Sequence, residues 1–430
     1  MQQNTFLLSL MCYIFEKHLS FSECFVTSLG KIFEIDDCGE NRSENENIYF
    51  NSIIISDGLR TKTNIFIAED TKIWLEWQRK NENLSETIGA VIVIDDNDTI
   101  NKYTSTPVIE VKCNISKQLI DKAGALLVSE SKICIDYLSK VEKFTLLNLL
   151  NRFVIERMES KHDLIMKKHN KLGEIWNSTF TSSLFDCVAI SKKRNRKNFN
   201  TLALNIGYDT VINQLETATS IEALLFGASG LLKYCHRHDD YTKKLFDEYL
   251  ILKKRFNIKE MEGMMWDYSS MVKENNLWIT IAQLSTILSL SRKFSYELEN
   301  GVNLKEIYSI LDRGTSEYWL THDTLSGDKT LCHNDRIMSQ ARKERMVING
   351  FIPFLFAYYK NNSMYEENEK LLEMLENISG EDNKITRKWC GNEKLSNDNA
   401  LISQSIIQIE KKYCAENRCP QCPIGKKLLR

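Results

Sequence analysis

Proline is scarce in this sequence, with 4 prolines among 430 residues, where about 5% is usual. Proline-rich linkers are therefore excluded. Nowhere do 18 apolar residues follow one another, so we expect no membrane-spanning helix. Lys and Arg (56) nearly balance Asp and Glu (58), which gives a net charge of -2. This balance excludes a uniform positive field that would draw the whole chain to nucleic acid or to a membrane.

Several catalytic signatures are also missing. The sequence has no GxGxxG, no Walker A lysine loop, no GxSxG elbow and no HExxH, which weighs against the reaction classes that use them. The 12 cysteines are too scattered for a disulfide scaffold, so we expect reduced thiols and a cytoplasmic protein. The apolar start lacks a basic leader and a cleavage site, which favours an amphipathic first helix near residues 5–18 over a signal peptide.

Residues 1–112 predict a mixed α/β domain. After the first helix come short runs rich in Ile, Val and Phe, whose length and composition are typical of strands. Asp57 and Gly58 separate the second run from the third and predict a hairpin turn. The predicted strands are residues 31–35, 48–55, 63–68, 90–94 and 108–111.

The rest of the chain predicts helices. Apolar residues recur at helical spacing near residues 146–154, 371–378 and 402–413. The nearly apolar stretch at residues 220–230 predicts a central helix, and Gly227 and Gly230 would allow another backbone to approach it. We therefore expect an α+β protein with an N-terminal α/β domain (1–112), a connecting segment (113–144), a helical domain (145–400) and a C-terminal helix with a cysteine tail (401–430).

Five short motifs resemble those of one bacterial family. They are IEALLFG at 221–227 followed by Gly230, IAQ at 281–283, SEYW at 316–319 with His322, PFLFAY at 353–358, and the ending with Tyr413, Cys414, Cys419, Cys422, Ile424 and Gly425. Together they are similar to the family named domain of unknown function 2851. The resemblance is strong over 145–430 and weak over 1–112, and it implies no established activity.

The weak resemblance over residues 1–112 is informative, because relatives in this family carry GPDFFN and NVEIH stretches in the N-terminal domain. By analogy with restriction-type nucleases, an Asp on one strand and a Glu on the next would hold a magnesium ion. Here Ile48 takes the place of the Asp and Phe66 that of the Glu, while Ala68 replaces the His. Such side chains bind no cation, so the resemblance implies a degenerate, nuclease-like domain. Glu69 and Asp70 are the nearby acids that would have to substitute.

The clearest chemical signal is the spacing of Cys414, Cys419 and Cys422. Two cysteines two residues apart can clamp one metal ion. Three interpretations stay open: zinc, which usually takes four ligands; an iron–sulfur cluster, which usually takes four cysteines; or thiols that bind no metal. The candidates for a fourth ligand are Cys390, His322, Cys332 and His333.

Two segments concentrate positive charge. The run Lys192, Lys193, Arg194, Arg196 and Lys197 predicts a loop that is either solvated or in contact with phosphates. The tail from Lys411 to Arg430 has six basic residues and one acid, and solvated basic residues at a helix end are the plainer interpretation.

Glu317 and His322 lie too far around one helix to share an acid–base site, so we interpret SEYW as a structural motif with a buried Trp319.

These observations favour a non-catalytic binding or scaffold protein, associated with nucleic acid or a protein partner and not with a membrane. The alternative is an enzyme, either a metal-dependent nuclease or a cluster-bearing nucleic-acid enzyme. A purely structural partner of another cytoplasmic protein is the third hypothesis.

Overall fold

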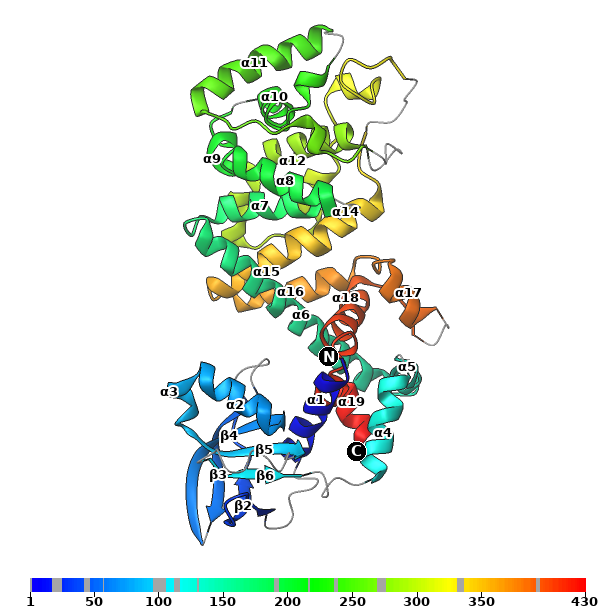
Figure 1. The fold of residues 1–430 in the computed structure, drawn as a ribbon. Coiled ribbons are helices and arrows are strands. Elements are labelled where there is room, and N and C mark those ends of the chain that lie inside the picture. Colours follow the sequence, from blue (N-terminus) through cyan, green and yellow to red (C-terminus); the bar gives the residue numbers. More distant parts are fainter. Residues whose placement is uncertain are drawn as a thin grey trace. The chain divides into compact units, whose positions relative to one another are not determined.

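Six strands form one mixed sheet in the N-terminal part of the chain, and helices dominate the remainder (Figure 1). This confirms the expected α+β class. The computed structural model describes residues 2–17, 25–41, 47–56, 58–95, 106–111, 117–129, 131–188, 193–215, 217–235, 239–268, 276–330, 336–391 and 395–430. None of the helices in these ranges is long and apolar enough to cross a membrane.

The chain divides into two compact units. The sheet unit comprises Met1–Phe153, Asp382–Ser396 and Ser405–Arg430, and the helical unit comprises Val154–Glu381 and Asn397–Gln404. These boundaries differ from those expected from the sequence. The segment 113–144, expected to be a connector, contributes two helices to the sheet unit, and the cysteine tail joins the same unit.

The strands lie in the sheet in the order in which they occur along the chain. The first four pair antiparallel, whereas β4, β5 and β6 are parallel to one another. The expected first helix and five expected strands are confirmed, with small shifts at their ends. The strands are β1 (Phe25–Val26), β2 (Ile32–Asp37), β3 (Ile48–Ser56), β4 (Leu59–Asp70), β5 (Ile88–Asp95) and β6 (Val108–Glu110).

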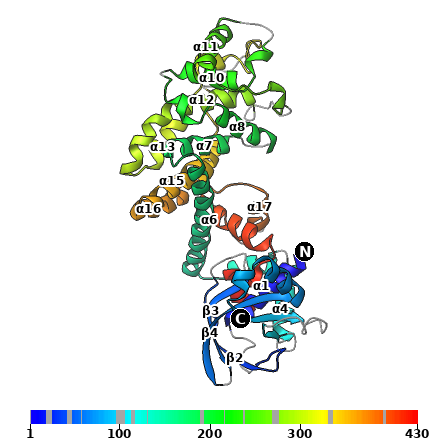
Figure 2. The same ribbon diagram turned by 60° about the vertical axis from the view of Figure 1, so that its left-hand side comes forward.

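A tight hairpin joins the two longest strands, β3 and β4, which lie side by side (Figure 2). Ser56 pairs with Leu59, so two residues make the turn, as the Asp-Gly signal predicts. Gly58 has φ +74°, a conformation that favours glycine. Asp57 itself lies outside the described residues.

Helices cover both faces of the sheet. Successive side chains of a strand point to opposite faces, so Phe66 faces one side and Ile65 the other. On the first side, α2 (Thr71–Lys80) places Trp74 against Phe66, with ring centroids 5.1 Å apart. On the other side, α1 (Gln2–Lys17) packs against β4, and its Phe15 ring contacts Tyr49. Because helices cover both faces, Ile88, Ala90, Val91, Ile92 and Val93 of β5 are all buried.

The sheet unit is completed by helices from distant parts of the sequence. Two helices, α6 and α18, belong partly to this unit and partly to the helical unit. The helices of the sheet unit besides α1 and α2 are α3 (Glu82–Ser85), α4 (Lys117–Val128), α5 (Lys132–Leu138), the start of α6 (Lys143–Lys171), α17 (Lys384–Cys390), the end of α18 (Ala400–Gln408) and α19 (Pro423–Leu429).

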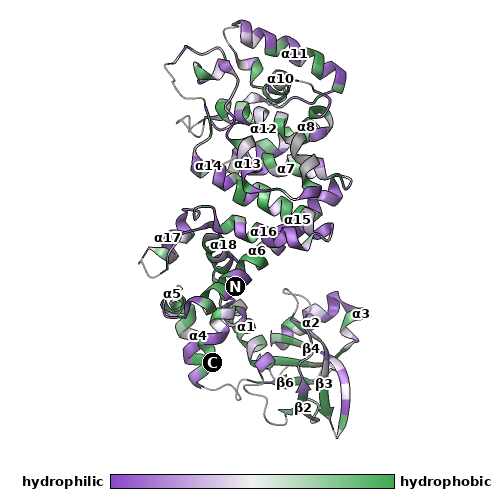
Figure 3. Ribbon diagram, turned by 180° about the vertical axis from the view of Figure 1, so that it is seen from behind, coloured by the Kyte–Doolittle hydropathy of each residue, from purple (hydrophilic) through white to green (hydrophobic). Residues whose placement is uncertain are grey.

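The helical unit is a stack of helices around an apolar interior. Amphipathic helices such as α11 alternate between hydrophilic and hydrophobic colour (Figure 3), as expected for a helix with one buried face. Besides parts of α6 and α18, its helices are α7 (Trp176–Val188), α8 (Lys193–Asn205), α9 (Asp209–Ile212), α10 (Ala218–Ala228), α11 (Asp240–Phe256), α12 (Leu277–Glu297), α13 (Leu304–Leu311), α14 (Gln340–Met346), α15 (Ile352–Asn361) and α16 (Tyr365–Glu376).

Helix α10 is the predicted central helix, with every residue from Ile221 to Ala228 buried. Its two glycines permit different close approaches. At Gly230, which has φ +76°, a Cβ would lie 2.1 Å from the backbone oxygen of Met261, so another backbone does approach. At Gly227 the neighbour is instead the ring of Tyr249, also 2.1 Å from the ideal Cβ position.

We expect Gly227→Ala to destabilise the protein by about 1–3 kcal/mol, the usual cost of overpacking a core, because the methyl group collides with the Tyr249 ring. The matched control is Gly124→Ala in α4, where a Cβ meets no atom within 4 Å. That change should be neutral or stabilise by up to about 1 kcal/mol. Urea denaturation measures both, and equal effects of the two substitutions would contradict the packing at Gly227.

Candidate functional site

The centre of the sheet is apolar at the two positions where the nuclease analogy requires acids. Ile48 and Phe66 are direct partners across the β3–β4 pair. They are 0% and 3% exposed. The Phe66 ring also lies 4.7 Å from that of Trp77, centroid to centroid. Apolar side chains therefore fill the space that a hydrated magnesium ion and its carboxylates would occupy.

The acids that follow on β4 do not form a replacement centre. Asp70 is the N-cap of α2, where its carboxylate accepts a hydrogen bond of 2.9 Å from the backbone N–H of Ile73. Glu69 is half-buried at the end of the same strand. Within the ranges that the structure describes, no three His, Cys, Asp or Glu side chains are grouped so as to hold a metal ion.

The three cysteines of the tail lie in the last turns of the sheet unit. Cys414 ends a π-helical turn (Ile409–Cys414), Cys419 begins a 3₁₀ turn (Cys419–Gln421), and Cys422 caps α19. The chain is tightly folded here, because a Cβ on Gly425 would lie 1.9 Å from the backbone oxygen of Cys419. Cys422 is buried, and the other two are half-buried.

Cys134 of α5 is a further buried cysteine of the sheet unit. Burial, with smaller contributions from Cys422 and Cys419, raises the pKa of its thiol to about 12. Burial also raises the pKa of Cys414. Within the residues that the structure describes, these cysteines do not form a group that could hold a metal ion.

None of the fourth ligands considered from the sequence joins the tail cysteines in a metal-holding group within the described ranges. Cys390 is in the sheet unit, where its thiol donates to the backbone oxygen of Ser396 at 3.7 Å. His322 belongs to the helical unit, and Cys332 and His333 lie outside the described residues.

The basic run begins a helix instead of forming the expected loop. Residues 193–197 make up the first turns of α8, which has no acidic residue in its first turn. Arg196 and Lys197 are exposed, whereas Asn195 bonds the backbone of Asp267 through both ends of its amide. Lys192 lies outside the described residues. Cations at a helix N-terminus face the positive end of the helix dipole, an unfavourable placement unless an anion joins them.

The family motifs IEALLFG and SEYW meet at a buried carboxylate. Glu222, in the middle of α10, accepts hydrogen bonds from Trp319 Nε1 (2.5 Å) and Ser316 Oγ (3.2 Å), and Tyr241 supplies another. Trp319 is fully buried, as predicted. His322 stacks on the ring of Tyr318, 4.0 Å away, and does not contact Glu222. The arrangement fixes helices with neutral donors and offers no acid–base pair.

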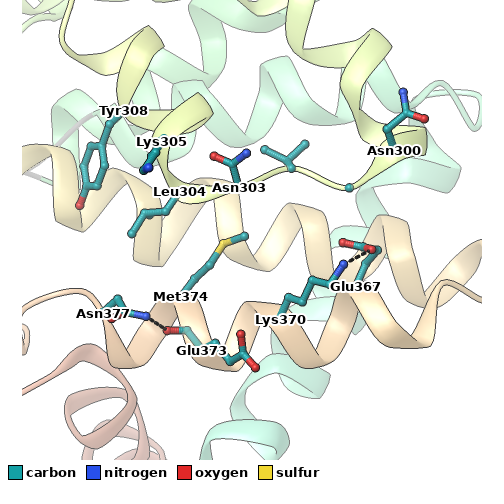
Figure 4. Close-up of a pocket in the computed structure, with 12 residues that line it drawn as sticks. Asn300, Asn303, Leu304, Lys305, Tyr308, Glu367, Lys370, Glu373, Met374 and Asn377 are labelled. Atoms are coloured by element: carbon teal, nitrogen blue, oxygen red, sulfur yellow. Dashed lines mark hydrogen bonds and ion pairs between the residues drawn. The ribbon is translucent and has the colours of Figure 1, made fainter.

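A cavity of about 540 Å³ lies between the start of α13 and α16 (Figure 4). Among its lining residues, Lys370 pairs with Glu367 at 2.6 Å, and Asn303 forms a capping box with Glu306 at the start of α13. Val302, Leu304 and Met374 supply apolar walls. None of the residues singled out from the sequence lines it, and we assign it no chemistry.

Comparison with known proteins adds one match. A family model described as "Protein of unknown function (DUF2851)" matches residues 9–384. The match extends through the sheet, where the resemblance was weak, and ends before the cysteine tail. No protein with a curated description and no solved structure matches the chain.

Burial raises the pKa of Glu222 above its usual 4.5, partly offset by its three hydrogen bonds. The folded chain therefore keeps this proton to higher pH than the unfolded chain. The resulting stabilisation is fully present below about pH 4.5 and is lost as pH rises through the folded-state pKa. Glutamine does not titrate, so the Glu222→Gln variant does not lose stability in this way as the pH rises. We therefore expect its free energy of unfolding, relative to that of the wild type, to increase with pH.

Denaturation of both proteins between pH 4 and pH 9 checks this prediction. The exposed Glu317→Gln is the control and should follow the wild-type curve at every pH. A Glu222→Gln curve that runs parallel to the wild-type curve would contradict a buried, proton-retaining carboxyl.

Proposed function

The chain belongs to the DUF2851 family, and we propose that it is a non-catalytic protein that binds nucleic acid. In this proposal the sheet keeps the arrangement of a metal-dependent nuclease without its reactive centre, and a basic helix start contacts phosphates. The single observation that carries the proposal is the direct pairing of buried Ile48 and Phe66.

The topology supports the nuclease comparison. Three antiparallel strands, β2 to β4, are followed by a helical crossover and a parallel strand, β5. The presumed Asp and Glu positions fall opposite each other on β3 and β4, which is where a shared cation would require them. Because isoleucine and phenylalanine have no ligand atoms, the position can no longer bind metal or activate water.

The start of α8 supports a polyanionic ligand. Arg196 and Lys197 are exposed cations in the first turns of α8, where positive charge opposes the helix dipole. A phosphate at this position would be attracted by the side chains and by the helix N-terminus together. No aromatic residue is interspersed in the run, so the proposal involves backbone contacts and not base stacking.

We expect no Mg²⁺- or Mn²⁺-dependent cleavage of single- or double-stranded DNA or RNA above the background of a metal-free control. A gel assay with labelled substrates measures this. Metal-dependent cleavage that is lost in Glu69→Gln or Asp70→Asn would contradict the proposal and restore the nuclease alternative. Asparagine caps helices about as well as aspartate, so Asp70→Asn tests chemistry and not the start of α2.

Replacing Lys192, Lys193, Arg194, Arg196 and Lys197 with Gln should weaken binding to a labelled duplex. Each lost phosphate contact should also reduce the slope of log affinity against log salt by about 0.9. Fluorescence anisotropy at several salt concentrations measures both quantities.

The matched control removes the same charge elsewhere in the helical unit, from the exposed residues Lys243, Lys244, Lys254, Arg255 and Lys259. This control should bind with nearly the wild-type salt slope. If both variants lose affinity equally, binding depends on the overall charge of the protein, and the assignment of the binding site to α8 is wrong.

A further inference from the structure

Helix α8 has one buried face and one exposed face. The exposed face runs from Arg196 and Lys197 through Asn200 to Leu204. These residues are three or four positions apart, so their side chains lie on the same side of the helix. The residues of the buried face are Asn198, Phe199, Leu202 and Ala203.

The buried face fixes α8 to the rest of the helical unit. The amide of Asn198 donates to the backbone oxygen of Met265 at 2.8 Å, and the Phe199 ring lies 5.0 Å from that of Trp266, centroid to centroid. The indole N–H of Trp266 in turn donates to the backbone oxygen of Ser229, the C-cap of α10, at 3.0 Å. The exposed side chains are therefore presented from a helix whose position is set by packing, as precise recognition requires.

Charge indicates what binds to the exposed face. Between Asp186 and Asp209 the sequence has five basic residues and no acidic residue. Arg196 and Lys197 of this stretch are exposed. A polyanion is the complementary partner of such a surface. The exposed face also continues past the cations to Asn200 and Leu204, which can contribute nothing to phosphate binding by charge.

We propose that the exposed face of α8 enters the major groove of B-form duplex DNA and contacts base edges there, Arg196 at a guanine and Asn200 at an adenine. The inference rests on the function proposed above, which requires only phosphate contacts. It goes beyond that function by naming the form of nucleic acid and the side chains that distinguish its bases.

The exposed side chains have the donors and acceptors that this recognition requires. Arginine donates two hydrogen bonds to N7 and O6 of guanine, and asparagine pairs with N6 and N7 of adenine. Asn200 follows Arg196 by four residues, about 6 Å along the helix axis. That rise corresponds to about two base pairs at ~3.4 Å each. Leu204, a further four residues along, is apolar and exposed, which suits contact with a thymine methyl group.

The shape of the groove distinguishes DNA from other nucleic acids. The major groove of B-form DNA is about 12 Å wide and admits an α-helix, whereas the major groove of duplex RNA is too deep and narrow for side chains to reach the bases. Single strands are usually bound by stacking on aromatic rings. The exposed face of α8 has no aromatic residue, because Phe199 belongs to the buried face.

The first experiment selects duplex DNA with a randomised central segment on the full chain and sequences the bound molecules. We expect an enriched motif that contains a guanine and an adenine. Replacing the adenine should weaken binding about 5- to 150-fold, the usual effect of losing one bidentate contact. Duplex RNA of the selected sequence should compete no better than unselected DNA. Competition by this RNA as strong as that by the selected DNA would overturn the assignment to the major groove.

Asn200→Ala tests the adenine contact. This variant should lose the preference for adenine at that position and keep the wild-type dependence on salt, because no charge is removed. Alanine is the best helix former, so α8 is retained. Asn170→Ala, at an exposed asparagine in the last turn of α6, is the matched control and should keep both properties. An adenine preference that survives in Asn200→Ala, or is lost in both variants, would overturn the role of Asn200.

Lys197→Gln should give the opposite result. The slope of log affinity against log salt should fall by about 0.9 for one lost phosphate contact, and the preferred sequence should stay the same.

Failure of this inference is distinguishable from failure of the proposed function. Equal affinity for every duplex DNA sequence would overturn base recognition by α8 and leave the phosphate-binding function standing. Absence of binding to any duplex DNA or RNA would overturn both.

Discussion

The pairing of Ile48 with Phe66 across two neighbouring strands is the constraint on which the proposed function of the sheet unit depends. Both side chains are buried beneath α2, against the rings of Trp74 and Trp77. Burying one side chain of this size stabilises a protein by about 1.5–3 kcal/mol, whereas an uncompensated carboxylate at the same place would cost several kcal/mol (~3–5 when its partner is missing). The same two positions therefore serve either a packed core or a cation site, and this chain has the packed core.

The interior of the helical unit, unlike the centre of the sheet, contains a buried polar group, the carboxyl of Glu222. Glu222 lies on a helix that is otherwise apolar, and its oxygens are satisfied by Ser316, Trp319 and Tyr241. Buried polar groups are tolerated when they are hydrogen-bonded. The two family motifs that carry these residues thus meet in space and join α10 to a segment about 95 residues later, which supports the interpretation of SEYW as a structural motif.

Local patterns predicted local structure well and long-range structure poorly. The length of residues 48–55 and 63–68 and their Ile, Val and Phe content identified the strands, and the Asp-Gly dipeptide identified the turn between them. The spacing of Cys414, Cys419 and Cys422 predicted a metal site, but within the described residues no group of His, Cys, Asp and Glu side chains could hold a metal ion. The start of α8 was expected to be a loop, since charge and low hydrophobicity are shared by loops and exposed helix ends.

By itself, the sequence determined the α+β class, the strands of the sheet, the apolar character of the presumed nuclease positions and the three tail cysteines. These follow from residue type and short-range periodicity, which depend on neighbours within one or two turns or strands. The tertiary structure decided which distant residues come together: Ile48 with Phe66 and the tryptophans of α2, and Glu222 with Trp319. The physical reason is that burial and pairing depend on how separate elements pack, and no local pattern along the chain encodes that packing directly.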